Sequence, residues 1–285
     1  MIKVSVIIPT YNSSKYIREA IVSVLNQTYK NIEIIVIDDG SEDNTNDVLK
    51  DYIKSGAIEY FYKKNQGQAS ARNFGIKKSR GEIIAFLDAD DLWLPEKLEK
   101  QIKKLQTTSA DICFTDVEVF GKTESAGKRF SQIAEFHQGE ILKSLIRTNF
   151  LVNSSILMKR AVFEKIGFQN EKRIYRNIED YDYWIRAALD GINFVYLPEA
   201  LTQYRIHRDQ SSKNQIYGLK SLCAMYVVLM FNSKILAKGE IFEVIEMLAR
   251  HAKTFTLLNL KSFLKKTLFY RRLLICREHR NLGKK

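Results

Sequence analysis

Apolar and polar positions alternate with two different periods along the first hundred residues. Runs of β-branched and aliphatic residues at 4–8, 32–37 and 83–87 are typical of strands that are buried on both faces. Between them, residues 14–26 and 68–79 repeat apolar side chains at helical spacing. Because strand and helix follow each other repeatedly, the pattern predicts an α/β fold with a mostly parallel central sheet covered by helices.

The same two periods predict further elements. Asn12 or Ser13 is expected to cap the helix over 14–26. Glycine and polar residues are interspersed through 116–150, which predicts a loop with one short helix. Helices are expected over 43–53, 95–105 and 181–190, and strands over 58–62, 111–115, 154–159 and 193–196.

The pattern changes after residue 212. We therefore divide the chain into an α/β domain over 1–212 and a helical C-terminal extension over 213–285. The helices of the extension are expected over 215–231, 240–253 and 256–278. Gly239 is expected to separate the first two of them.

Charge is distributed unevenly between these two parts. The chain carries a net +12, and residues 213–285 hold 15 basic and 4 acidic residues, a net +11. A basic extension favours an anionic partner. Two interpretations stay open: helices with a solvated basic face, or a peripheral anchor on an anionic membrane surface, where each basic residue contributes about 1 kcal/mol. Nucleic acid is disfavoured as a partner because no recognised binding motif accompanies the charge.

Cysteine usage and the start of the chain indicate a compartment. Cys113, Cys223 and Cys276 are widely spaced, and neither a disulfide framework nor a zinc spacing is present, which favours a reducing environment. A buried strand begins almost at once, so we expect no signal peptide. The longest apolar run, 222–231, is shorter than the roughly 20 residues that a membrane span needs. We expect a cytoplasmic protein, free or peripheral at the inner face of the cell membrane.

Polar clusters follow three of the predicted strands. They are Pro9–Asn12, Asp38–Thr45 and Asp88–Asp91. Ligands of open parallel sheets bind outside the carboxyl ends of the strands, so the three clusters predict one shared cleft. Taken singly, each cluster is also explained by a turn or a helix cap, including Asp91 ahead of the helix over 95–105.

Asp88 and Asp90 have a specific chemical use. A hard divalent cation prefers carboxylate oxygen and often takes one or two protein carboxylates together with substrate phosphates. Such an ion offsets the charge of a diphosphate leaving group. Neither GxGxxG nor GxxxxGK[ST] occurs in the sequence, so phosphates would have to be held in another way.

Five further residues carry alternatives. Arg72 is either a solvated surface cation or a group that reaches nucleotide phosphates or holds Asp39. Glu179, Asp180 and Asp182 either stabilise a helix N-terminus or include one general base. A lone histidine such as His207 is more often structural than a ligand, and only the neighbouring motifs favour a functional role.

Six motifs together resemble one family. VSVIIPTYN, IIVIDDGSEDNT, NQGQASARNFGI, AFLDADD, IEDYDYW and YRIH are similar to those of family 2 glycosyltransferases of the GT-A fold, in the family's order over roughly residues 3–212. The resemblance implies a Rossmann-like nucleotide-sugar-binding domain and inverting transfer of a sugar, of hexosyl or N-acetylhexosaminyl type, from a nucleotide-sugar donor. Uridine diphosphate is the favoured nucleotide, with thymidine and guanosine left open.

The resemblance also implies roles for individual residues. Asp90 would be the main ligand of Mn²⁺ or Mg²⁺, with His207 near the metal or the diphosphate. Asp180 would be the catalytic base, and Glu179 would orient the acceptor or the sugar. Tyr11 would stack on the base, Asp39 would accept from it, and Asp88 would contact the ribose. The nucleotide-binding residues would be Pro9, Thr10, Tyr11, Asp39, Arg72 and Asp88.

The QxxRW motif of processive polysaccharide synthases is missing from this sequence. We therefore expect a non-processive enzyme that acts on a glycan or a lipid-linked oligosaccharide in cell-surface polysaccharide or glycoconjugate synthesis. The alternative from another class is a non-catalytic nucleotide-sugar-binding or scaffold protein on the same fold. A sugar-nucleotide pyrophosphorylase would need a Gly-rich loop where PTYNSS stands, and a glycosidase would not explain a nucleotide cleft.

Overall fold

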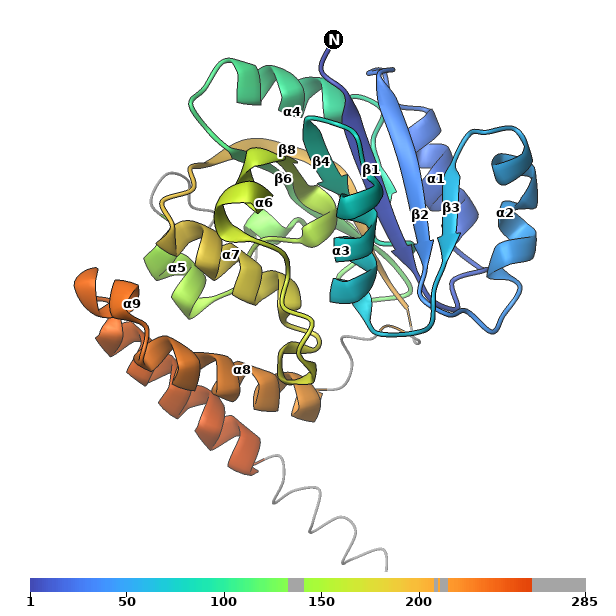
Figure 1. The fold of residues 1–285 in the computed structure, drawn as a ribbon. Coiled ribbons are helices and arrows are strands. Elements are labelled where there is room, and N and C mark those ends of the chain that lie inside the picture. The colour runs from blue at the N-terminus through green and yellow to red at the C-terminus, as the bar shows by residue number, and fades with distance from the viewer. Residues whose placement is uncertain (133–140, 208–209, 211–214, 258–285) are drawn as a thin grey trace, which may run out of the picture. The chain divides into compact units, whose positions relative to one another are not determined.

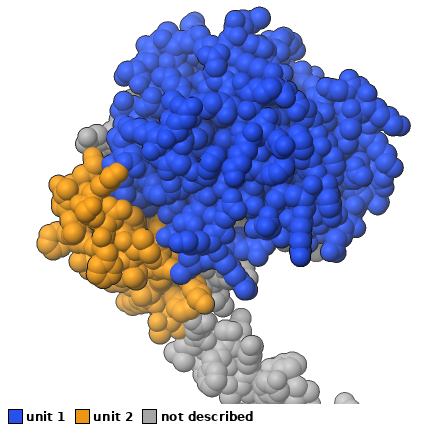
Figure 2. All heavy atoms as spheres, viewed as in Figure 1, with its two compact units in different colours: residues 1–211 blue, residues 212–285 orange. Residues whose placement is uncertain are grey.

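The computed structural model describes residues 1–132, 141–207, 210 and 215–257. The chain divides into two compact units, which Figure 2 shows in different colours. Unit 1 comprises residues 1–211 and unit 2 comprises residues 212–285.

Unit 1 contains an eight-stranded sheet with the strand order β3-β2-β1-β4-β7-β6-β8-β5. The first four strands in this order are mutually parallel, and β6 and β8 also pair in parallel. The pairs β4–β7, β6–β7 and β5–β8 are antiparallel. The expected mostly parallel sheet is thereby confirmed. The strands are β1 (Val4–Thr10), β2 (Ile32–Asp38), β3 (Glu59–Tyr62), β4 (Ile83–Phe86), β5 (Leu92–Trp93), β6 (Ile112–Gly121), β7 (Ile156–Lys159) and β8 (Phe194–Ile206).

Helices cover both faces of this sheet (Figure 1). The α-helices of unit 1 are α1 (Ile17–Leu25), α2 (Thr45–Lys54), α3 (Gln68–Lys78), α4 (Lys97–Gln106), α5 (Leu142–Arg147), α6 (Ala161–Ile166) and α7 (Glu179–Leu189). Short 3₁₀ turns are η1 (Phe130–Gln132), η2 (Asn153–Ser155) and η3 (Arg173–Tyr175).

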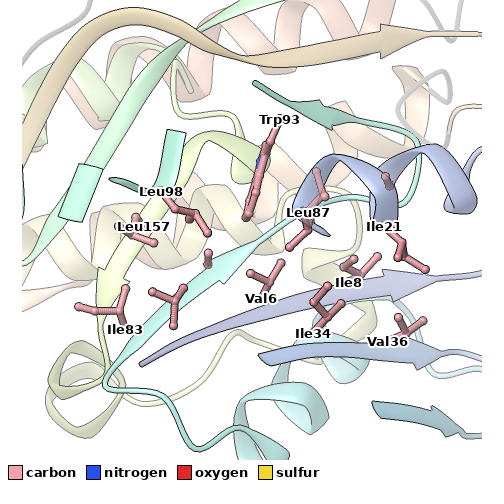
Figure 3. Close-up of a cluster of buried hydrophobic side chains, with 14 of the residues drawn as sticks. Val6, Ile8, Ile21, Ile34, Val36, Ile83, Leu87, Trp93, Leu98 and Leu157 are labelled. Atoms are coloured by element: carbon pink, nitrogen blue, oxygen red, sulfur yellow. The ribbon is translucent and has the colours of Figure 1, made fainter. Parts of the chain in front are cut away.

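Strand alternation assigns the helices to the two faces, because successive side chains of a strand point to opposite sides. Val6 and Ile8 of β1 join a core cluster with Ile21 of α1 and Leu98 of α4, as Figure 3 shows. On β2, Ile34 and Val36 belong to the same cluster, whereas Ile35 and Ile37 point to the opposite face and pack with Ala71 of α3. The core thus has one layer under α1, α2 and α4 and a second layer under α3.

The second face also carries α6 and α7. Phe86 of β4 meets Phe163 of α6 with ring centroids 6.4 Å apart, and Phe163 stacks on Tyr183 of α7 at 5.5 Å. This packing brings the first turn of α7 to the same side of the sheet as α3. Both helices start near the carboxyl ends of the central strands (Figure 1).

The first helix begins later than its apolar spacing predicts. α1 starts at Ile17 with Tyr16 as N-cap, so the expected caps Asn12 and Ser13 are wrong. Asn12 instead has a positive φ of 50°, and its side-chain oxygen accepts hydrogen bonds from the N–H groups of Glu42 and Asp43. Asn12 therefore holds the loop before α2 and is not available to cap α1.

Two strands are longer than expected. β6 continues through residues 116–121, where a loop was expected, and β8 extends far beyond the strand expected over 193–196. The two strands pair along their whole length, with a register irregularity around Asp116. Pro198 and this irregularity interrupt the simple alternation on which the prediction depended. The expected short helix corresponds to α5, and residues 133–140 lie outside the described part.

Unit 2 is helical, as expected. It contains α8 (Gln215–Met230), the short α9 (Ser233–Ala237) and a helix over 241–257. Tyr226 stacks on His251 with ring centroids 5.4 Å apart, which ties α8 to the last helix. Gly239 has a φ of +74° at the expected break. Most of the helix expected over 256–278 lies outside the described residues. No helix within the described ranges is long and apolar enough to cross a membrane.

Candidate active site

The carboxyl ends of β2, β1 and β4 lie side by side, because these strands are parallel neighbours. The Asp39 N–H donates to the Thr10 carbonyl at 2.8 Å, and the Asn12 N–H donates to Ser41 Oγ at 2.9 Å. The structure therefore brings the first two polar clusters of the sequence to one edge of the sheet. The third cluster follows β4 at the same edge.

Asp39 is buried and its carboxylate is fully engaged. It accepts hydrogen bonds from Lys63 Nζ at 2.6 Å and from the N–H groups of Gln66 at 3.0 Å and Gly67 at 2.7 Å. Gly67 has a φ of +98°, a backbone conformation that favours glycine. Asp39 thus fixes the turn that leads into α3, and Lys63, not Arg72, is its cationic partner.

The residues after β1 present an exposed ring beside buried groups. Pro9 and Thr10 are buried, whereas the Tyr11 side chain is 48% exposed. Thr10 Oγ1 is buried and finds no hydrogen-bond partner among the described residues. An exposed ring at a strand end is available to stack on a flat ligand.

The acidic loop after β4 is anchored by its third carboxylate. Asp91 is fully buried and accepts hydrogen bonds from Ser154 Oγ at 2.6 Å and from the Arg205 N–H at 3.0 Å. Ser154 Oγ also accepts from the Asp88 N–H at 3.1 Å. Asp91 therefore joins the loop to η2 and β8, and it does not cap α4. Burial, followed by the charges of Asp90 and Asp88, raises the pKa of Asp91.

Asp90 meets His207 at the end of β8. His207 Nε2 lies 2.8 Å from Asp90 Oδ2, although the two residues are 117 positions apart in the sequence. The Tyr16 ring packs against the imidazole with centroids 4.6 Å apart, and Arg205 Nε donates to the Asp90 carbonyl at 2.8 Å. Burial and the charge of Asp88 raise the pKa of Asp90.

Asp90 and His207 form a donor set that suits a divalent cation with few protein ligands. The Asp90 carboxylate is the ligand type that Mn²⁺ and Mg²⁺ prefer, and both ions commonly complete their shells with water and substrate phosphate, whereas the His207 imidazole is a softer ligand that suits Mg²⁺ less well. The described residues contain no group of three or more His, Cys, Asp or Glu side chains arranged for a metal. A cation held here would therefore depend on oxygens from a ligand.

Arg72 lies at the centre of the remaining acids. Its guanidinium is buried, with NH2 2.8 Å from Asp88 Oδ1 and NH1 3.7 Å from Glu179 Oε1. The close packing of α3 on β1 places it there: a methyl group added at Gly75 would lie 2.5 Å from Ile7 Cγ2. Arg72 Nε and Glu179 Oε2 are buried without partners in the described part of the chain.

Asp180 follows Glu179 in the first turn of α7. Burial, and then the neighbouring charge of Glu179, raise the pKa of Asp180 to about 7, against the opposing effect of Arg72. The Tyr181 N–H donates to Asp180 Oδ1 at 2.7 Å. A carboxyl group with a pKa near neutrality is suited to accept and release a proton. Asp182, the third acid of this turn, pairs with Arg186 at 2.9 Å.

The structure adds residues that the sequence analysis did not single out. Ser154, Lys63, Tyr16 and Arg205 each position one of the candidate groups described above. Arg205 lies inside the YRIH motif, so the sequence contained a signal that could have identified it. Ser154 offered none, because its partners are more than sixty residues away in the sequence.

Comparison with known proteins decides the family. A family model described as glycosyl transferase family 2 matches residues 5–167. The chain belongs to this family. An uncharacterized glycosyltransferase of Rickettsia typhi is 37% identical to this family 2 chain over 233 residues, which cover 78% of the chain and 70% of that protein. One of Rickettsia bellii is also 37% identical, over 215 residues, but the chain spans only 30% of its length.

Solved structures share the fold of this family 2 chain. TarS of S. aureus superimposes with a TM-score of 0.67 at 20% identity, covering 90% of this chain and 73% of that chain. The mannosyltransferase PcManGT of Pyrobaculum calidifontis, in complex with GDP-Man and Mn²⁺, gives a TM-score of 0.66 at 17% identity, covering 94% and 79%. The expected GT-A fold is confirmed.

Proposed function

We propose that the protein is an inverting glycosyltransferase that moves a sugar from a nucleotide-sugar donor to a hydroxyl group of an acceptor. One observation carries the proposal: Arg72 joins Asp88 at the nucleotide edge of the sheet to the Glu179–Asp180 pair, where the pKa of Asp180 is about 7. A proton acceptor thus stands beside the strand ends that hold ligands in this class of sheet. Family membership supports the same activity.

The donor would lie across the ends of β1, β2 and β4. In this arrangement Pro9, Thr10 and Tyr11 hold the base, with the exposed Tyr11 ring stacked on it, and Asp88 contacts the ribose. Asp39 has two possible roles in this proposal. It accepts a hydrogen bond from the edge of the base, or it fixes the Gln66–Gly67 turn, and its observed hydrogen bonds favour the second role. Arg72 supports the nucleotide by holding Asp88.

A uridine diphosphate sugar is the proposed donor. TarS has been solved in complex with UDP-GlcNAc, which supports a uridine nucleotide and an N-acetylhexosamine, with a hexose as the alternative sugar. PcManGT holds GDP-Man, so a guanosine donor is the main competitor. Thermal shifts with UDP-sugars and GDP-sugars separate the two.

The chain's own residues account for the chemical step. Asp180 accepts the proton of the acceptor hydroxyl while the hydroxyl oxygen attacks the anomeric carbon from the face opposite the diphosphate. The bond from the anomeric carbon to the diphosphate breaks, and its electron pair leaves on the diphosphate. Because attack and departure take place on opposite faces, the configuration inverts. Glu179 orients the acceptor or the sugar and holds Arg72. When bound by Asp90 and His207, Mn²⁺ or Mg²⁺ supplies positive charge that offsets the charge of the diphosphate.

The proposed acceptor is a glycan or a lipid-linked oligosaccharide in cell-surface polysaccharide or glycoconjugate synthesis. In this proposal residues 1–212 are the catalytic domain and residues 213–285 are a basic extension. The net charge of +11 on the extension supports peripheral association with the inner face of the cell membrane. A non-catalytic nucleotide-sugar-binding protein is the competing function, and the raised pKa of Asp180 disfavours it.

Thermal shifts with UDP, GDP, dTDP and their sugars, with Mn²⁺ or with chelator, identify the donor. A ligand at a hundred times its dissociation constant stabilises by about 2.7 kcal/mol, which is readily measured. We expect metal-dependent stabilisation by UDP-sugars that Asp90→Ala removes. Stabilisation by GDP-sugars alone would mean that the donor is a GDP-sugar. Absence of stabilisation by every nucleotide tested would contradict the proposal.

Donor turnover then separates enzyme from binding protein. Asp180→Asn is expected to lower the rate of donor consumption about 10²- to 10⁴-fold while sparing nucleotide binding. Asp51→Asn on the exposed side of α2 is the matched control and should leave both unchanged. Equal turnover by Asp180→Asn and the control would contradict the assignment of the base.

A further inference from the structure

Unit 2 carries an apolar surface at the end of its helical hairpin, where α8 gives way to α9 and then to the helix over 241–257. Phe231 is 81% exposed and Phe242 is 78% exposed, more than any other aromatic side chain in the described ranges. We call this surface the hairpin tip. Its exposed large apolar residues are Val227, Val228, Phe231, Leu236, Phe242 and Ile245.

The hairpin tip is distinct from the core of its own unit. On α8 the buried residues Met225, Tyr226 and Leu229 lie on one side of the helix, whereas Val227 and Val228 lie on the other. On the last helix, Val244 and Met247 are buried and Phe242 and Ile245 are exposed. Each helix thus uses one apolar stripe for packing and retains a second one that faces outward.

Scattered exposed apolar residues are normal, but a cluster of them needs a partner. The exposed large apolar side chains of unit 1 are spread from Met1 to Ile174, whereas six fall between residues 227 and 245. Two of the six are phenylalanines: Phe231 directly follows α8, and Phe242 lies in the first turn of the helix over 241–257. This is the arrangement of a surface that enters the boundary of a lipid layer.

The positive charge of the extension favours an anionic partner for this surface. Residues 215–257 hold five basic and three acidic residues, and Lys220 on α8, Lys238 at the end of α9 and Lys253 on the last helix are exposed. Glu246 is paired with Arg250 at 3.2 Å. The chain then runs into residues 258–285, whose sequence holds nine basic residues and one acidic residue. Two copies of this basic extension would repel each other in a dimer, whereas an anionic bilayer attracts each of them. Apolar and basic residues together are the two signals that stable membrane attachment requires.

We propose that the hairpin tip, residues 227–245, inserts into the interface of an anionic lipid bilayer, with Phe231 and Phe242 as the inserted side chains. The exposed lysines of the hairpin bind the anionic headgroups. This inference rests on the proposed membrane association and specifies the surface that makes it. Binding to lipid requires neither donor nor acceptor, so it is measured independently of transfer.

Flotation of the full chain with vesicles tests the proposal. The probes are vesicles of phosphatidylcholine alone and of phosphatidylcholine mixed with phosphatidylglycerol. Wild type is expected to bind the mixed vesicles and to bind less at high salt. Phe231→Ser with Phe242→Ser is expected to lower the partition coefficient on the order of tenfold for each ring removed. The matched control replaces two exposed apolar residues of unit 1, Val22→Ser with Leu25→Ser, and should bind like wild type.

The outcomes are separable. Equal binding by wild type and the double phenylalanine variant would overturn the proposal, as would absence of vesicle binding by wild type. Self-association of wild type that the double variant loses, without binding to vesicles, would assign the surface to a second copy and also overturn it. Donor binding is measured on the same samples. Vesicle binding without donor binding would contradict the proposed transferase, and donor binding without vesicle binding would contradict only the surface.

Discussion

Two ionisable side chains of unit 1, Asp180 and Lys97, are held where burial moves their pKa toward neutrality from opposite directions. The pKa of Asp180 is raised, and the carboxyl group remains close to Glu179 and Arg72. Lys97 of α4 is fully buried, donates to Gln101 Oε1 at 2.7 Å and lies 4.1 Å from the Trp93 ring centroid. Both shifts oppose folding near neutral pH, and under the proposed function the first also serves a proton transfer.

The pH dependence of the rate should report Asp180. Because a base must be unprotonated, donor turnover is expected to fall as the pH drops through about 7, the pKa of Asp180. The same raised pKa affects stability. Asp180 loses its proton at about pH 4 in the unfolded chain but only at about pH 7 in the folded chain, so its contribution to the free energy of unfolding declines as the pH rises between these two values. A rate profile that is flat between pH 5 and pH 8 would exclude Asp180 as the group that titrates.

Stability against pH should report Lys97. Burial lowers the pKa of Lys97 to about 7, so between about pH 7 and pH 10.5 the unfolded chain binds the additional proton and stability rises with pH. Lys97→Met should remove this slope and increase the free energy of unfolding near pH 7, by at most about 1.4 kcal/mol for each pKa unit less the cost of about 1–3 kcal/mol for leaving the buried Gln101 Oε1 without its donor. Urea denaturation at several pH values measures it, and Lys103→Met, exposed on the same helix, should change little.

Among the elements, α3 has the tightest constraint. It lies against β1 and β2, and Gly75 allows its backbone to approach Ile7. Arg72, three residues earlier on the same helix, reaches Asp88 and Glu179 because of this approach. The absence of a side chain at Gly75 therefore determines both the position of α3 and the placement of Arg72 beside Asp88 and Glu179.

Gly75→Ala should reveal this link. The added methyl would lie 2.5 Å from Ile7 Cγ2, so α3 must shift, at a cost of about 1–3 kcal/mol in stability. We expect a lower melting temperature together with reduced donor turnover, since Arg72 moves with the helix. Gly218→Ala on α8 meets no atom within 4 Å and should be neutral or slightly stabilising. An unchanged melting temperature for Gly75→Ala would show that the helix tolerates the methyl.

Sequence patterns predicted the elements that depend on local regularity. β1, β2 and β4 were expected as buried apolar runs, and the polar residues after them were expected at one edge of the sheet. The late start of α1 was not predictable from spacing, because Asn12 is used by a loop thirty residues away. The full length of β8 was hidden by Pro198, since a proline normally ends a strand, and the strand continues past it because it pairs with β6 and β5.

At the scale of the whole molecule, the candidate residues all belong to unit 1. The proposed base, metal and nucleotide residues lie between Pro9 and His207, and unit 1 has its own sheet and core. The pairing of Asp90 with His207 was expected only through family resemblance. No local pattern joins two residues that are 117 positions apart. The roles assigned to these residues stay predictions until the variants are measured.

A chain that ends at residue 211 should therefore retain donor binding. We expect the dissociation constant for the donor nucleotide to stay within about a factor of two of the full chain, since a change of that size is below about 0.5 kcal/mol. Isothermal titration calorimetry on both chains measures it. Loss of binding with a folded unit 1 would mean that residues 212–285 take part in the donor site.

The anchoring of Asp91 by Ser154 and Arg205 has a consequence for the newly made protein. The chain leaves the ribosome from its N-terminus, so β1 to β4 are available to pair before η2 and β8 have been synthesised. The N–H that fixes Asp91 belongs to a residue 114 positions later, which takes roughly 6–23 s to arrive at ordinary rates of translation. During that interval Asp88 can already pair with Arg72, whereas Asp90 and Asp91 follow a finished strand without the later residues that hold them, and this is the stage of synthesis at which a chaperone would protect the edge of the sheet.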